Sequence, residues 1–224
     1  MSRILFAVIA ALLLASCQEQ SSGDDYTTKY YDDGRSKPSV AIVPVIDSTS
    51  YEVSWSLSEE FSLMIRKKLS RNGSIYLSKE FDTKTAPALT HNPFSNDISW
   101  VKQAYPKEEF IVFCELVEHS NMPVEKSNAE KIMSAEKLKE VSTNLNMGMR
   151  IRVIDLRRAE PKIVLQELIK DSYFISKNHI DTDYSLITWG IDEYETSPMG
   201  MAHNMLSKEV AERIEDYVSL AKSR

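Results

Sequence analysis

The 224-residue sequence is poor in glycine, histidine and cysteine, with six, four and two of them, and each scarcity excludes a kind of site. The glycines form neither a P-loop nor a G-x-G-x-x-G motif, so a phosphate-binding loop is not expected. The histidines form no H-x-x-x-H pair and no His/Cys cluster at metal-ligand spacing, and no G-x-S-x-G motif marks a nucleophile. We therefore expect no catalytic residues, no metal and no cofactor, and a protein that is not an enzyme.

Basic residues are also in the minority. The chain has 27 lysines and arginines against 33 carboxylates, for a formal net charge of −6. Nucleic-acid-binding domains need a basic field, so we expect no nucleic-acid partner. The same balance argues against broad electrostatic adhesion to anionic lipid, so membrane attachment should be through Cys17 alone.

The sequence has a single long apolar run, over residues 4–14 after the positively charged Arg3. The run is too short to span a bilayer, which takes about 20 residues, and its pattern is typical of a secretory signal. It ends at Leu14-Ala15-Ser16-Cys17, which resembles the lipobox of bacterial lipoproteins. The resemblance implies that residues 1–16 are removed and that lipid chains on Cys17 anchor the mature protein. The alternative is a buried thiol that follows an apolar run by chance.

Two further residues depend on this interpretation. Gln18 stands where an aspartate would favour retention in the inner membrane, so the resemblance implies an outer-membrane lipoprotein that faces the periplasm, with the leaflet left open. With Cys17 lipidated, Cys114 has no intramolecular partner. Cys114 lies in the apolar stretch 110–116, which indicates a buried strand where a free cysteine packs as a small hydrophobe. No histidine or basic residue adjoins it to lower its pKa.

The rest of the chain divides into a tether and one domain. Residues 17–37 are polar without periodicity and indicate a flexible tether after Cys17. Residues 38–224 indicate a single α/β domain, with a charged helical insertion at about 123–142 and a long loop at 176–196.

Apolar periodicity predicts the elements of this domain. Ser56 and Glu59 form a capping box before one helix, Gly73 follows its end, and Ser197-Pro198 begins the last helix. Between residues 145 and 153 apolar and polar residues alternate strictly, which indicates a strand with one face on the core and one in water. The predicted order is β-α-β-α-β-(helical insertion)-β-β-α, which is an α+β fold: a two-layer α/β sandwich with a mixed sheet of about five strands and helices on one face. The strands are expected at 39–46, 74–78, 109–118, 145–153 and 163–175, and the helices at 57–69, 97–105 and from 197 onward.

This order, with the first strand Val40-Ala41-Ile42-Val43-Pro44-Val45 ending near a proline, resembles the small α/β domain of several bacterial envelope lipoproteins. These are the curli-secretion lipoprotein, the lipoprotein activator of penicillin-binding proteins, and the N-terminal domain of the Tol-system propeller protein. As a whole the chain also resembles a conserved chlamydial outer-membrane lipoprotein. It departs from the pore-forming curli member, because it has no pair of long amphipathic segments.

Two surfaces are candidates for binding a partner. The first is the sheet face with Arg150 and Arg152, which suits a glycan or a carboxylate of a partner, or else pairs with Glu167 and Asp171 across the hairpin. The second is the 176–196 loop, with aromatic residue types that are enriched at interfaces. Its three candidates are Tyr184, Trp189 and Tyr194.

Two polar groups have weaker claims to function. The segment His179-Ile180-Asp181-Thr182-Asp183 could supply a base or a metal loop, and Glu115, Glu118 and His119 lie near a strand end. Solvated side chains are the simpler interpretation of both.

The sequence thus predicts a membrane-tethered, non-catalytic protein-interaction or assembly module of the bacterial envelope. It would have an envelope protein partner, and homo-oligomerisation is left open. The alternatives are an envelope hydrolase acting on cell-wall glycan or peptide, and a ring-forming subunit of a secretion assembly.

Overall fold

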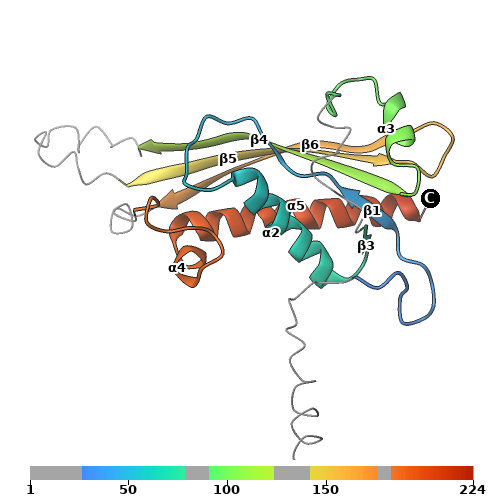
Figure 1. The fold of residues 1–224 in the computed structure, drawn as a ribbon, viewed down its shortest axis with the longest axis horizontal. Helices are drawn as coiled ribbons and strands as arrows, with labels where there is room; N and C mark the ends of the chain where they lie inside the picture. The colour runs from blue at the N-terminus through green and yellow to red at the C-terminus, as the bar shows by residue number, and fades with distance from the viewer. Residues whose placement is uncertain (1–26, 79–90, 124–141, 176–182, 224) are drawn as a thin grey trace, which may run out of the picture.

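A computed structural model describes residues 27–78, 91–123, 142–175 and 183–223 (Figure 1). The signal segment 1–16, Cys17 and positions 124–141 of the expected insertion lie outside the described residues. The elements in chain order are β1 (Ser39–Ile42), β2 (Ile46–Asp47), α2 (Leu57–Asn72), β3 (Tyr76–Leu77), α3 (Ser99–Ala104), β4 (Phe110–Pro123), β5 (Thr143–Asp155), β6 (Lys162–Ile175), α4 (Asp192–Glu195) and α5 (Pro198–Lys222).

The strands form one mixed sheet in the order β3-β1-β4-β5-β6, with β2 also paired to β4. β1 runs parallel to β3 and β4, whereas β4, β5 and β6 form a long antiparallel ladder. The first predicted strand is divided into β1 and β2 because Pro44 has no N–H and the N–H of Val45 donates to Ser62 Oγ of α2 at 2.8 Å. The predicted α+β class with a mixed sheet is confirmed, with six strands in place of about five.

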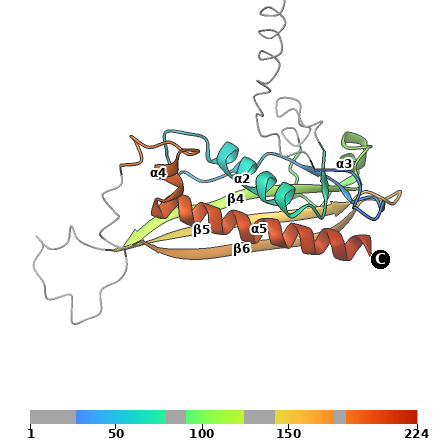
Figure 2. The same cartoon turned by 90° about the horizontal axis from the view of Figure 1, so that it is seen from below.

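The two long helices cover one face of the sheet (Figure 2). At the start of α2 the Ser56 side chain accepts from the N–H of Glu59, and at its end Gly73 takes a left-handed φ of 70°. Helix α5 begins as predicted, with Ser197 as cap and Pro198 in the first turn. The fully buried side chains between these helices and the sheet form the main core: Phe61, Ile65, Leu69, Met147, Met149, Ile151, Val153, Leu206, Val210, Ile214 and Val218.

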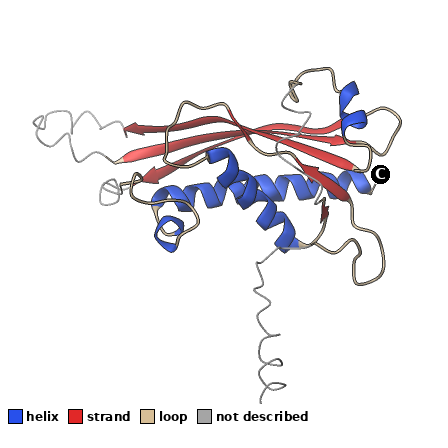
Figure 3. Ribbon diagram, in the orientation of Figure 1, coloured by secondary structure: helices blue, strands red, loops and turns tan. Residues whose placement is uncertain are grey.

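The short helix α3 packs on the opposite face of the sheet (Figure 3). Val101 of α3 and Tyr105, which follows its end, belong to a second buried cluster that includes Phe113 of β4 and Ile154 of β5. Because α3 covers part of the second face of β5, the strict alternation predicted that face to be more open to water than it is. The predicted core face is buried, but the other face of β5 is open to water only in its first half.

The fold begins before residue 38. Residues 27–37, which the sequence assigns to the tether, carry an antiparallel bridge between Tyr30 and Ser36. The Tyr31 hydroxyl donates to the carbonyl of Ser74 at 2.6 Å, and the N–H of Leu77 donates to Thr27 Oγ1 at 2.9 Å. This segment therefore lies against β3 at the edge of the sheet. None of the helices in the described ranges combines the length and the hydrophobicity of a membrane-spanning segment.

Candidate functional site

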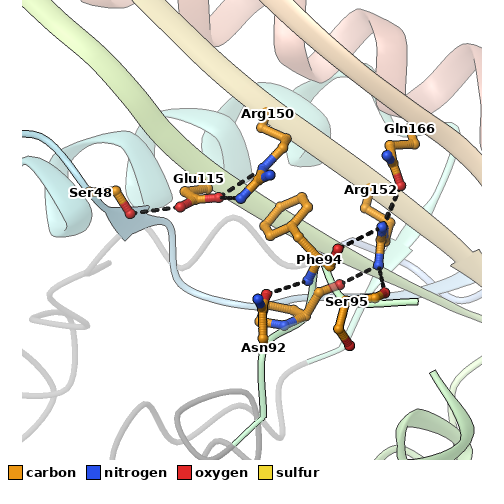
Figure 4. Close-up of polar contacts among 9 residues, drawn as sticks. Ser48, Asn92, Phe94, Ser95, Glu115, Arg150, Arg152 and Gln166 are labelled. Carbon is orange, nitrogen blue, oxygen red and sulfur yellow. Dashed lines mark hydrogen bonds and ion pairs between the residues drawn. The ribbon is translucent and has the colours of Figure 1, made fainter. Parts of the chain in front are cut away.

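Arg150 and Arg152 lie on the same face of β5, opposite to α2 and α5 (Figure 4). In the ladder Arg150 stands across from Leu168, and Arg152 stands across from Gln166. Glu167 is opposite Ile151 and so belongs to the other face of the sheet. The predicted pairing of the two arginines with Glu167 and Asp171 is therefore wrong, because the register places those carboxylates on the helix side.

Arg152 is buried, with 2% of its surface exposed. Its Nη1 atom donates to the carbonyls of Pro93 (2.8 Å) and Ser95 (2.6 Å), and Nη2 donates to that of Phe94 (3.0 Å). Its Nε donates to Gln166 Oε1 at 2.9 Å. The guanidinium thus fastens the 93–95 loop onto the sheet through neutral acceptors, and a partner cannot reach it. The prediction that Arg152 binds a partner is corrected by this burial.

Arg150 keeps part of its side chain accessible, with 39% exposed. Its Nε donates to Glu115 Oε2 at 2.9 Å, and Nη2 forms an ion pair with the same carboxylate. Glu115 also accepts from Ser48 Oγ at 2.7 Å. The guanidinium carbon lies 4.1 Å from the centroid of the Phe94 ring, within the range of a cation–π contact. Arg150 is therefore neutralised by Glu115 but remains available at the surface, and it stays a candidate contact.

The aromatic residues of the predicted binding loop mostly face inward. Tyr194, in α4, is fully buried, so its predicted role in partner binding is corrected. Tyr184 and Trp189 are half-buried and pack against the main core, and the Tyr184 hydroxyl accepts from the N–H of Met199 at 3.3 Å. The large apolar side chain most exposed in residues 183–196 is Leu186, at 83%. Residues 176–182, which include His179, lie outside the described part.

A buried polar network forms where α2, α4, α5 and β4 meet, and the sequence did not indicate it. His203 Nδ1 lies 2.8 Å from Glu60 Oε1, and His203 Nε2 lies 2.8 Å from His119 Nε2. Trp55 Nε1 donates to Glu60 Oε2 at 2.8 Å, and the Tyr194 hydroxyl donates to Oε1 of the same carboxylate. His119 was expected to be solvated, but only 5% of it is exposed.

The contacts of the two imidazole rings restrict their hydrogen-bond roles. A carboxylate only accepts, so His203 donates to Glu60 through Nδ1. Of the two facing Nε2 atoms of His203 and His119, one donates to the other. The buried Nδ1 of His119 has no hydrogen-bond partner among the described residues. Burial, aided by the His203 ring, lowers the pKa of His119 to about 3.

The network is closed to substrates, because Glu60, His203 and Tyr194 are fully buried. Burial and the adjacent Glu60 charge raise the pKa of the Tyr194 hydroxyl, so it stays a neutral donor. The arrangement therefore joins two helices, α4 and a strand through hydrogen bonds in the interior. Its chemical role is structural, in that it fixes α4 and the preceding loop on the rest of the fold.

We expect the His119 ring to make stability depend on pH. Its pKa is about 6.5 when unfolded and about 3 when folded, so the unfolded chain binds more protons between these values. The free energy of unfolding should fall by about 2 kcal/mol from pH 7.5 to pH 5 on this account. Urea titrations at both pH values should show a smaller fall for His119→Asn. The exposed His91, changed to Asn, serves as control, and an unchanged slope in His119→Asn would contradict the assignment.

Among the residues that the structure describes, no group of three or more His, Cys, Asp or Glu side chains is placed to hold a metal ion. Cys114 is free and buried in β4, as its sequence context predicted, and burial raises the pKa of its thiol to about 12. It is therefore unreactive at neutral pH.

Comparison with known proteins gives a family. Residues 26–222 match the model of a family of unknown function, DUF7499. The chain belongs to this family. The match begins at residue 26, close to Thr27, the residue whose hydroxyl meets β3. The DUF7499 domain thus includes the segment before residue 38. No curated protein matches the chain.

Among solved structures, the hypothetical protein CT253 from Chlamydia trachomatis is similar to this chain, with 25% identity and a TM-score of 0.64. The alignment covers 82% of this chain and 98% of the chlamydial one. Lipoprotein GNA1162 from Neisseria meningitidis has 10% identity and a TM-score of 0.36, over 80% of this chain and 99% of that one. The PelC dodecamer from Paraburkholderia phytofirmans has 10% identity and a TM-score of 0.39, over 78% and 84%. The last two likenesses are too weak to support conclusions about this chain.

Proposed function

We propose that this DUF7499 protein is a lipid-anchored, non-catalytic interaction or assembly module of the bacterial envelope. The anchor is supported by the sequence Leu14-Ala15-Ser16-Cys17 at the end of a short apolar run. One structural observation carries the interaction role. The convergent titratable groups Glu60, His119 and His203 are sealed inside, whereas large apolar side chains stand in solvent at one end of the sheet.

This apolar end of the sheet is where β4 and β6 flank the start of β5. Asn144 of β5 pairs with Met122 of β4 on one side and with Phe174 of β6 on the other. All three side chains therefore lie in one row on one face of the sheet. Met122 is 55% exposed and Phe174 is 65% exposed. Exposed apolar side chains in such a row are residue types found at protein interfaces.

The interaction role is tested by capture of partners from envelope extract with the anchored full chain. A specific envelope protein should be retained by the wild type and lost on Phe174→Ser with Met122→Ser. Leu220→Ser, which changes a comparably exposed residue of α5, serves as the control and should keep the partner. Turnover of cell-wall glycan or peptide without a partner would instead favour the hydrolase. Light scattering gives the mass of the captured complex and so distinguishes a ring of copies of this chain from a complex with a different protein.

The anchor predicts its own result. Cys17→Ser should abolish labelling by a radioactive or clickable fatty acid, and the protein should leave the membrane fraction, because the thiol is the attachment atom. Cys114→Ala should retain both labelling and membrane association, since Cys114 is buried in β4. Labelling that persists in Cys17→Ser would overturn the lipobox assignment.

A further inference from the structure

The place where the chain enters the fold limits how the domain can stand on a membrane. Thr27 accepts from the N–H of Leu77, and Tyr31 donates to the carbonyl of Ser74, so the entry point is fixed beside β3 and the end of α2. Only residues 18–26 separate this point from Cys17. A chain of this length spans at most about 35 Å when fully extended. If Cys17 is lipidated as proposed, the surface around Thr27 is the part of the domain nearest the lipid.

The charges of the domain are distributed unevenly, although its net charge is negative. Residues 66–78, which include the C-terminal part of α2, contain four basic residues and no carboxylate. Residues 27–37 add Lys29, Arg35 and Lys37 against two aspartates. The two segments are in contact, because Lys29 Nζ lies 5.2 Å from the centroid of the Tyr76 ring. These two segments therefore carry an excess of positive charge at the entry point, where the neighbouring carboxylate of Glu215 on α5 accepts hydrogen bonds from Asn72 and Ser74.

Negatively charged residues are concentrated at the N-terminal end of α2 and near α4 (Figure 1). Residues 47–65 and residues 183–197 contain no lysine or arginine. Their exposed carboxylates are Asp47, Glu52, Glu59, Asp183, Asp192, Glu193 and Glu195. An anionic membrane would attract the entry end of the domain and repel the α4 end.

We propose that the surface formed by residues 27–37 and 66–78 docks on anionic phospholipid headgroups and orients the anchored domain with α4 away from the membrane. The proposal rests on the lipid anchor of the proposed function. Lys67 and Arg71 on α2 and Lys29 of the entry segment are exposed and carry the contact. Each basic side chain near an anionic surface should raise the ratio of docked to undocked protein roughly fivefold at low salt. This proposal departs from the expectation, drawn from net charge, that lipid contact is confined to Cys17.

The test supplies the anchor chemically, so that it does not depend on acylation in cells. The mature chain from Cys17 is coupled to a maleimide lipid through this thiol, because Cys114 is buried and its pKa is raised. The coupled protein is placed on vesicles of phosphatidylcholine alone or of phosphatidylcholine and phosphatidylglycerol in a two-to-one mixture. The reaction of each lysine with an acetylating reagent is then followed by mass spectrometry.

On phosphatidylglycerol vesicles Lys29 and Lys67 should react severalfold more slowly than on phosphatidylcholine, whereas Lys162 and Lys170 on β6 should be unchanged. Arg35→Gln with Arg71→Gln should remove this protection, and so should high salt. Arg158→Gln with Arg213→Gln, the same charge change outside the two basic segments, should retain it. Equal reaction rates on both vesicles, or protection that survives loss of Arg35 and Arg71, would overturn the proposal. The vesicle experiment does not depend on acylation of Cys17 in cells. If that acylation does not occur, only the fatty-acid labelling experiment shows it.

Discussion

Replacing Glu60 by leucine should lower the free energy of unfolding by about 3–5 kcal/mol, one of the two largest effects expected of a single substitution in this fold. The carboxylate accepts hydrogen bonds from Trp55, Tyr194 and His203, and it is fully buried. Leucine fills the space but accepts nothing. Trp55 would then lose its acceptor, and the Tyr194 hydroxyl and His203 Nδ1, which lie 2.8 Å apart, would have only each other. Each donor left without an acceptor in the interior costs about 1–3 kcal/mol before relaxation.

A matched pair of substitutions isolates this effect from helix propensity. Glu59→Leu changes the preceding residue of the same helical turn, which is exposed, and should cost less than about 1 kcal/mol. Glu60→Gln keeps one carbonyl acceptor but presents an N–H₂ group to at least one donor, so its cost should lie between the two. Urea unfolding followed by tryptophan fluorescence measures all three. If Glu60→Leu were no less stable than Glu59→Leu, the network would contribute nothing to stability.

The network shows what periodicity can and cannot reveal. The apolar stripes of α2 and α5 are set by neighbours three and four residues apart, so these helices and their Ser56 and Ser197 caps follow from the sequence. Glu60 and His203 are 143 residues apart, and His203 and His119 are 84 residues apart. No local pattern distinguishes such residues from solvated ones. Only the packing of α2 and α5 against β4 brings them together.

Contacts between distant parts of the chain also explain why Arg150 and Arg152 differ in exposure. Both occupy polar positions of an alternating strand, and the sequence gives them equal claims to an exposed face. The loop at residues 93–95, more than fifty positions away, covers Arg152 and leaves Arg150 at the edge of that cover. Tyr194 is not a surface residue for a related reason, because its hydroxyl donates a hydrogen bond to Glu60 inside the fold.

Arg152→Met should destabilise the protein by about 3–4 kcal/mol. Methionine replaces the buried stem of the arginine but donates no hydrogen bond, so the carbonyls of Pro93, Phe94 and Ser95 would lose their contact with the guanidinium. Arg150→Met on the same strand should cost about 1 kcal/mol or less, because the Arg150 guanidinium is partly exposed. Chemical denaturation of the two variants provides the direct comparison.

Amide hydrogen exchange then shows where the lost stability lies. If the Arg152 guanidinium fastens the loop, Arg152→Met should speed exchange at residues 94–101 far more than in β6, whereas Arg150→Met should leave the loop protected. Arg152→Lys should be intermediate, since one ammonium group cannot reach three carbonyls and Gln166 at once. Equal exchange in the two methionine variants would mean that apolar contacts of Phe94 and α3 hold the loop without the guanidinium. The cover over the second face of β5 would then be a product of hydrophobic packing alone.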